Sequence, residues 1–305
     1  MLDYSALAAL SAVIRTGSFD AAAEALSVTP SAVSQRVKGL EERLGLPLVI
    51  RATPCRPTEA GARLAAHLDQ VALVEHDMMT GDPAWAAAFG GARPTLKIAL
   101  NADSLGTWFP GAAARFAALQ PNTLSLVLDD EADTAERLRS GEVIAAVTTA
   151  GKAVAGCRTL PLGSLRYVAA ATPDFRDRCF PDGLTAERLA KAPVLRFSPR
   201  DRLQLKWTEK VVGRAVEGPT HWVPSTQGFL DFTLAGVCWS LTPERLAAPL
   251  IASGRLVDLS PGVVVDVPLF WQHLRITTRL IEDLTRTVRA EAAGWLAAPH
   301  PNAVG

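Results

Sequence analysis

The fold of the first part of the chain is decided by FDAAAEALSVTPSAVSQRVKGLEERLGLPLVIR, residues 19–51. Two helical patterns in it are separated by the tight connection Ser27-Val28-Thr29-Pro30. Thr29 can cap the second helix, and Pro30 can occupy its first position, where the missing N–H costs nothing. Gly45 suits the left-handed residue that ends a helix, so the second helix is expected over residues 30–44. The stretch therefore predicts a helix-turn-helix.

The flanking residues extend this pattern. Apolar residues at helical spacing predict a helix over residues 4–15, and Ser18 is a candidate cap for the next helix, over residues 19–26. Residues 48–51 read as a short strand and residues 53–57 as a wing-like turn. The first sixty residues thus predict an all-α-rich, winged helix-turn-helix.

The second helix carries side chains that suit DNA on one face and an apolar stripe, Val33, Val37 and Leu40, on the other. Five basic residues face only two acidic ones between positions 29 and 57, which makes a local basic surface. A plain three-helix bundle with a solvated charged face is the alternative interpretation of spacing alone.

The order of residues decides between these interpretations. Residues 19–51, followed by RPTEAGARL at 56–64, resemble the N-terminal domain of LysR-type transcriptional regulators without a gap over about residues 1–65. The resemblance implies that the second helix enters the major groove of promoter DNA. It places Ser31, Ser34, Gln35 and Arg36 nearest base edges, and Lys38, Arg51 and Arg56 nearest phosphates. Ser18, Thr29 and Pro30 join the candidate DNA-binding set at the helix starts, and Thr29 and Thr58 can act as caps or as phosphate donors.

A connecting helix is expected after Thr58. Its apolar residues recur at intervals near 3.5, which suits pairing with another helix; they are Leu64, Leu68, Val71 and Met78. The alternative is that this stripe packs on the protein's own body. The resemblance implies pairing in a homodimer or homotetramer. The predicted units are residues 1–58 for DNA binding, 59–93 for the linker and dimerisation helix, and 94–305 for an effector-binding domain.

From residue 95 the pattern changes to alternating strands and helices, which predicts parallel α/β sheets. Strands are expected at 96–100, 124–128 and 143–149, with a helix over 105–119, and a second set follows from about residue 165. A strand over 263–273 is expected to return to the first set. The body then has two lobes, 94–164 with 269–305 and 165–268, and resembles the periplasmic-binding-protein architecture of LysR effector domains.

Ligands of open α/β sheets bind beyond the carboxyl ends of the strands. Many polar side chains fall at those ends and form the candidate effector site: Asn101, Asp103, Ser104, Trp108, Asp129, Asp130, Thr148, Arg196, Ser198, Ser225, Thr226 and Asp231. Several of them are also ordinary helix caps, and tryptophans are by default core residues. The number of carboxylates favours a cationic ligand, with helix N–H groups holding the ligand's own carboxylate.

The residues at this site carry a resemblance to a more specific group within the family. VSQRVKGLEERLG, residues 33–45, together with NADSLGTWFP, residues 101–110, is similar to the LysG/ArgP group, which regulates basic amino-acid export and senses lysine, arginine and, in some members, histidine. Gly106 is a departure from the pattern of that group. The resemblance implies a regulator that binds a promoter with an inverted repeat, with RNA polymerase as a possible further partner. A LysR-type regulator with another effector is the alternative.

Composition limits the other function classes. The chain has 31 Lys and Arg against 31 Asp and Glu, and its four cysteines and five histidines are scattered, so no cofactor or metal is expected. It holds no nucleophile elbow or phosphate loop, which argues against an enzyme. A solute-binding protein would lack the DNA-binding module. No apolar run reaches membrane-spanning length, so we expect a cytoplasmic protein without a membrane partner.

Overall fold

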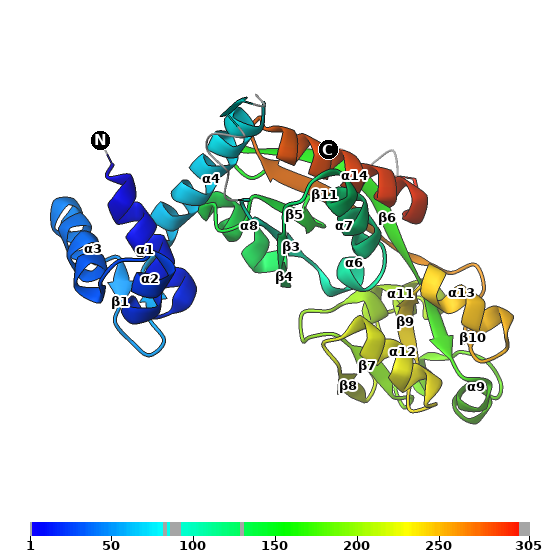
Figure 1. Cartoon of the computed structure of the whole chain (residues 1–305). Helices are drawn as coiled ribbons and strands as arrows, with labels where there is room; N and C mark the ends of the chain where they lie inside the picture. The colour runs from blue at the N-terminus through cyan, green and yellow to red at the C-terminus, as the bar shows by residue number, and fades with distance from the viewer. Residues whose placement is uncertain (1, 82–83, 86–92, 129–130, 299–305) are drawn as a thin grey trace.

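The computed structural model describes residues 2–81, 84–85, 93–128 and 131–298. Figure 1 shows a small helical domain at one end, a single long helix leading away from it, and a larger α/β body at the other end. Within the described residues, no helix has both the length and the apolar character needed to cross a bilayer.

The N-terminal domain is a winged helix-turn-helix, as the sequence predicts. Its elements are α1 (Tyr4–Thr16), α2 (Phe19–Ala25), α3 (Pro30–Leu44), β1 (Val49–Ile50) and β2 (Arg56–Pro57). Ser18 caps α2, Thr29 caps α3, and Gly45 ends α3 with φ 70°. The three helices enclose a core of small and branched residues that includes Leu7, Leu10, Val33, Val37 and Leu40. The wing is shorter than expected, because only two residues on each side pair.

Helix α4 (Glu59–Gly81) links the domain to the body. It packs so closely on the N-terminal domain that a Cβ on Gly61 would lie 2.0 Å from the carbonyl oxygen of Leu48. Further along, Leu73 enters the core of the body, and the Asp69 carboxylate accepts a hydrogen bond of 2.7 Å from Lys97. Both ends of the helix are thus held by contacts within the same chain.

Lobe 1 of the body contains three parallel strands in the order β4-β3-β5. They are β3 (Leu96–Leu100), β4 (Leu124–Leu128) and β5 (Ala145–Thr148), with helices α6 (Ala102–Gly106), α7 (Phe109–Leu119), α8 (Glu131–Ser140) and α14 (Arg279–Trp295). The single helix expected over 105–119 is two helices. The break falls at Thr107, where the backbone leaves helical geometry, and Pro110 lies in the first turn of the next helix.

Two long antiparallel strands run through both lobes: β6 (Cys157–Ala171) and β11 (Val265–Leu274). β11 also pairs with β5, which confirms the predicted return to lobe 1. The parallel sheet predicted for the first set is confirmed in β4-β3-β5. The crossing strands β6 and β11 pair antiparallel, so the sheet as a whole is mixed and the second set is not the parallel sheet that was expected. β6 starts well before the predicted position 165, and its pairing with β11 shifts register between Leu269 and Phe270.

Lobe 2 is built on the second half of β6. Its other strands are β7 (Val194–Arg196), β8 (Thr220–Trp222), β9 (Ser240–Pro243) and β10 (Val257–Asp258). Its helices are α9 (Pro173–Cys179), α10 (Ala186–Leu189), α11 (Leu203–Val212), α12 (Thr226–Leu234) and α13 (Glu244–Ala252). β9 and β10 pair antiparallel with β6, while β7 and β8 form a separate parallel pair. The two α/β lobes predicted from the sequence are confirmed.

Candidate nucleic-acid interface and interlobe site

Helix α3 presents its polar face to solvent. Val33, Val37 and Leu40 are buried, while Ser31, Gln35 and Lys38 are exposed and Ser34 and Arg36 are half-buried. This division follows from the apolar spacing, which turns one side of the helix into the domain core. The exposed half begins at the N-terminus of the helix, the end that helix-turn-helix proteins direct to base edges.

The acidic residues of α3 leave the basic face largely uncompensated. The Glu41 carboxylate accepts hydrogen bonds from the backbone N–H groups of Leu48 and Val49, at 2.7 and 3.3 Å, so it anchors the wing. Glu42 forms an exposed ion pair of 3.5 Å with Lys38. Such surface pairs are weak and readily exchanged for a phosphate.

The remaining candidate DNA contacts lie around this face. Arg51 and Arg56 are exposed on the wing, and the Arg51 guanidinium lies over the Phe19 ring at 5.2 Å. Ser18 and Thr29 serve as caps, and the Thr29 hydroxyl also lies 3.0 Å from that of Ser31. Pro30 occupies the first turn of α3, as predicted. Contact of any of these residues with DNA stays a prediction.

In the body, the Asp103 carboxylate joins the two lobes. It lies on α6 in lobe 1, and one of its oxygens accepts a hydrogen bond of 2.6 Å from the Thr226 hydroxyl, at the start of α12 in lobe 2. Its other oxygen accepts a hydrogen bond of 2.6 Å from the Tyr167 hydroxyl on β6. We call Asp103, Tyr167 and Thr226 the interlobe clasp.

The clasp holds a carboxylate in an unfavourable setting. Burial raises the pKa of the Asp103 carboxyl above its ordinary value, the two hydrogen bonds oppose this, and the negative charge of Asp201 raises the pKa further. Asp201 itself accepts hydrogen bonds from the backbone N–H groups of Phe197 and Leu203, both at 3.0 Å. Two carboxylates near one interlobe position, without a cation bonded to Asp103 among the described residues, would be stabilised by a cationic ligand.

Two orphaned polar atoms lie on elements that carry these groups. The Ser104 hydroxyl on α6 and the Gln204 side-chain oxygen on α11 are buried and have no hydrogen-bond partner within the described structure. Buried polar atoms of this kind are costly unless something satisfies them. The lack of a side chain at Gly106 lets the two lobes approach closely, because a Cβ there would lie 3.0 Å from the Thr226 Cβ.

The other candidate effector residues have mixed placements. Asn101 caps α6, Ser225 caps α12, and the Thr148 hydroxyl accepts from the backbone N–H of Ala150. Ser198 accepts from Arg200, and Asp231 is exposed and paired with Gln227. Asp129 and Asp130 lie outside the described residues.

Two candidates need correction. Trp108 is fully buried against Phe109 in the core of lobe 1, so it does not line the surface of the mouth. The Arg196 guanidinium is engaged within lobe 2, where it donates a 2.9 Å hydrogen bond to the carbonyl of Asp201 and stacks on Trp222 at 5.1 Å. It therefore shapes the loop that carries Asp201.

Two residues at the clasp, Tyr167 and Asp201, are not among the site residues predicted from the sequence. Tyr167 lies inside a strand predicted to be buried, and only its hydroxyl marked it as a residue that needs a polar partner. Asp201 lies in the loop after β7, five residues beyond the last residue of that strand, which placed it outside the strand ends that were considered.

The predicted dimerisation stripe divides between two environments. Leu64 and Leu68 pack partly against the core of the N-terminal domain, whereas Met78 is 53% exposed, as is its neighbour Val74 at 52%. The alternative of packing on the protein's own body therefore applies to the first half of the stripe. Pairing with a second copy through α4 stays a prediction.

A winged helix-turn-helix joined by a long helix to a two-lobed α/β domain, with polar groups between the lobes, defines a ligand-responsive DNA-binding regulator. Comparison with protein families identifies which one. Residues 4–62 match the bacterial regulatory helix-turn-helix protein of the LysR family, and residues 89–293 match the LysR substrate binding domain. The chain belongs to the LysR family of transcriptional regulators.

Relatives share nearly the whole chain. The transcriptional regulator ArgP of Pseudomonas aeruginosa is 43% identical over 298 residues, covering 97% of this chain and 98% of its own. The crystal structure of ArgP from Mycobacterium tuberculosis has a TM-score of 0.83 at 43% identity and covers 98% and 100% of the two chains. Full-length LysG from Corynebacterium glutamicum with bound effector arginine has a TM-score of 0.72 at 38% identity and covers 97% and 100%.

Proposed function

We propose that this regulator responds to a basic amino acid, lysine or arginine, bound between the two lobes beside Asp103. The observation that carries the proposal is the Asp103 carboxylate, which is half-buried between the lobes, has a raised pKa and, among the described residues, is bonded only to neutral hydroxyl donors. An ammonium or guanidinium group would supply the missing positive charge. The similarity to LysG, whose structure holds arginine, supports the same ligand class.

The effector would act by favouring one arrangement of the lobes. A ligand shifts a conformational equilibrium only by the difference between its affinities for the two states. A ligand that bonds to both α6 and α12 would bind more tightly when the lobes are close together, so it would favour that arrangement. In a dimer or tetramer, this change would move the paired DNA-binding domains on an inverted repeat. We propose an amino-acid exporter gene as the target, a cytoplasmic site of action and no enzymatic activity of its own.

Fluorescence anisotropy on DNA from upstream of the gene, against scrambled DNA, tests both halves of the proposal. It is repeated with L-lysine, L-arginine and L-histidine at one salt concentration, because salt alone changes such affinities by orders of magnitude. Sequence-preferring binding that shifts with a basic amino acid supports the proposal. Specific binding that ignores all three retains the regulator and rejects the effector.

Calorimetry with the amino acid that shifts DNA binding then tests the site. Asp103→Asn should weaken binding at least about tenfold, since it removes a charge-assisted contact. Asp174→Asn is the matched control, because that exposed carboxylate lies at the start of α9 and is not among the candidate effector residues. Equal affinity in both variants would remove Asp103 from the site.

A further inference from the structure

A concavity lies on lobe 1 and shares no residue with the interlobe clasp. It has a volume of about 650 Å³, which is within the range of small-molecule sites. Six of its lining residues are charged or titratable: Arg158, His273, Arg275, Glu282, Arg286 and Arg289. Four arginines thus face one carboxylate, in a protein whose formal net charge is zero.

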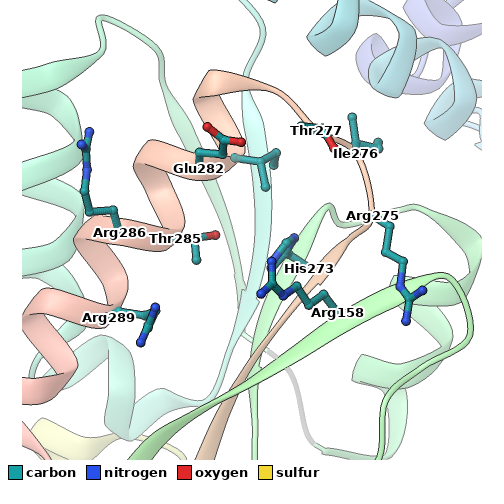
Figure 2. A pocket seen from close by; sticks show the side chains of 10 residues that line it. Arg158, His273, Arg275, Ile276, Thr277, Glu282, Thr285, Arg286 and Arg289 are labelled. Carbon is teal, nitrogen blue, oxygen red and sulfur yellow. The ribbon is translucent and has the colours of Figure 1, made fainter.

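The fold assembles these residues from three distant segments. Arg158 at the start of β6 is the direct cross-strand partner of His273 near the end of β11. Glu282, Arg286 and Arg289 recur at four and seven residues along α14, so they lie along the side of the helix that borders the concavity. Figure 2 shows Arg158 beside His273, with Arg289 projecting from α14 toward the pair.

Two of the arginines are already used by the protein. Arg275 donates a 3.1 Å hydrogen bond to the carbonyl of Cys157, and Arg286 pairs with Asp283 and points away from the strands (Figure 2). Arg158 and Arg289 have no acidic partner among the described residues. The electrostatic influence of Arg158 falls on His273, where burial, and after it this guanidinium, lowers the pKa of the imidazole.

We propose that this concavity, which we call the arginine pocket, binds a small anion with two or more anionic oxygens, a polycarboxylate or a phosphate. Arg158 and Arg289 supply two guanidinium groups from opposite walls, which suits a ligand with separated anionic oxygens. Among the lining residues, Ile281 is buried and Thr285 is half-buried, so the site is a hollow rather than a flat basic surface of the kind that tracks nucleic acid.

Calorimetry on the full chain, with citrate and separately with inorganic phosphate at matched ionic strength, tests the proposal and distinguishes the two anion classes. Arg158→Gln with Arg289→Gln should weaken the preferred probe at least about tenfold, as expected for losing two charge-assisted contacts. The control is Lys206→Gln with Arg255→Gln, which removes the same charge from exposed positions of lobe 2. Affinity in the control should stay within about twofold.

A second measurement covers the case in which the double variant is unstable. In the wild-type chain, the preferred anion should raise the pKa of His273, because a bound negative charge offsets the Arg158 guanidinium beside the imidazole. NMR follows this pKa, and His273→Gln assigns the signal. Glu282 also lines the concavity and is the one acidic residue among its described lining residues. Arg158→Lys keeps the positive charge but loses the planar fork, so it should retain part of this shift. Equal loss of affinity in the control, an unmoved His273, or failure of both anions to bind would overturn the proposal.

Discussion

At the scale of single residues, Asp103 links stability to ligand response. Burial raises the pKa of its carboxyl in the folded chain above the ordinary value of 3.8. Between the ordinary and the raised pKa of Asp103, the folded state therefore binds more protons than the unfolded state. This contribution to stability is lost as the pH rises through the raised pKa. A ligand cation offsets the cost at neutral pH.

Asp103→Asn should therefore raise the melting temperature at pH 7.5 by a few degrees and raise it less at pH 4.5, while the response to a basic amino acid disappears. The amide keeps an acceptor for the Tyr167 hydroxyl and removes the negative charge from this half-buried position. Thermal unfolding at the two pH values checks the first part, and DNA binding with and without arginine checks the second. A melting temperature that falls at pH 7.5 would show that the charge of Asp103 stabilises the clasp.

His273 provides a test of local electrostatics. Burial and the Arg158 guanidinium lower the pKa of its imidazole, so stability at this site is full above the ordinary value of 6.5 and is lost as pH falls through it toward the folded pKa. Arg158→Gln should raise the pKa of His273, measured by NMR titration. Arg275→Gln is the matched control, since that guanidinium is bonded to the Cys157 carbonyl; an equal rise in both variants would contradict the assignment to Arg158.

At the scale of elements, two adjacent glutamates on α3 allow the effect of a backbone hydrogen bond to be compared with that of a surface charge. Glu41 satisfies the backbone N–H groups of Leu48 and Val49 in the wing, whereas Glu42 forms only an exposed pair with Lys38. Glu41→Ala should destabilise the N-terminal domain by about 1–3 kcal/mol, the usual cost of unsatisfied buried donors. Glu42→Ala should stay within about 0.5 kcal/mol. Urea unfolding checks both, and equal losses would mean that Glu41 acts through charge alone.

Gln35 on the same helix and Arg56 on the wing strand β2 allow base reading and phosphate binding to be tested separately. Gln35→Ala should cost about 1–3 kcal/mol on the operator and almost nothing on scrambled DNA, because its exposed amide is placed for a base edge. Arg56→Ala should weaken both DNAs alike and reduce the salt slope by about one. Anisotropy over a salt series distinguishes the patterns, and a uniform loss for Gln35→Ala would move that residue to the backbone-contact group.

How far the sequence predicts each element depends on whether its cause is local. The caps Ser18 and Thr29 and the terminating Gly45 act within a few residues, so α2 and α3 were predicted to within a residue or so. The break between α6 and α7 was missed because helical apolar spacing continues across it. β6 was predicted too short because its first half is stabilised by pairing with β11, more than a hundred residues away.

The location of the candidate site was predictable from the sequence, but the full set of residues that form it was not. Asp103 and Thr226 were expected because each follows a predicted strand at the edge where ligands bind. Their mutual hydrogen bond, and the contribution of Tyr167, depend on how two separate lobes meet, which no local pattern encodes. Arg196 was overestimated for the same reason, since its cation is used by Trp222 and by its own loop.

At the scale of the whole molecule, the clasp couples ligand binding to the arrangement of the lobes. The lobes share β6 and β11, which run continuously between them, and the Thr226 hydroxyl adds a hydrogen bond from α12 to Asp103 on α6. Because Gly106 lets Thr226 approach, this bond forms only when the lobes are close. It therefore favours the same arrangement that a ligand bridging both lobes would favour.

Thr226→Val should consequently raise the arginine concentration needed for half of the DNA-binding response by about tenfold or more, the equivalent of one hydrogen bond to a charged group. The full response should persist at saturating arginine, because the ligand's higher affinity for the closed arrangement of the lobes still favours closure. Thr226→Ser keeps the hydroxyl and is the matched control, which should respond like the wild type. An identical concentration dependence in the valine and serine variants would show that the lobes close without the clasp, and that Asp103 serves only to bind the ligand.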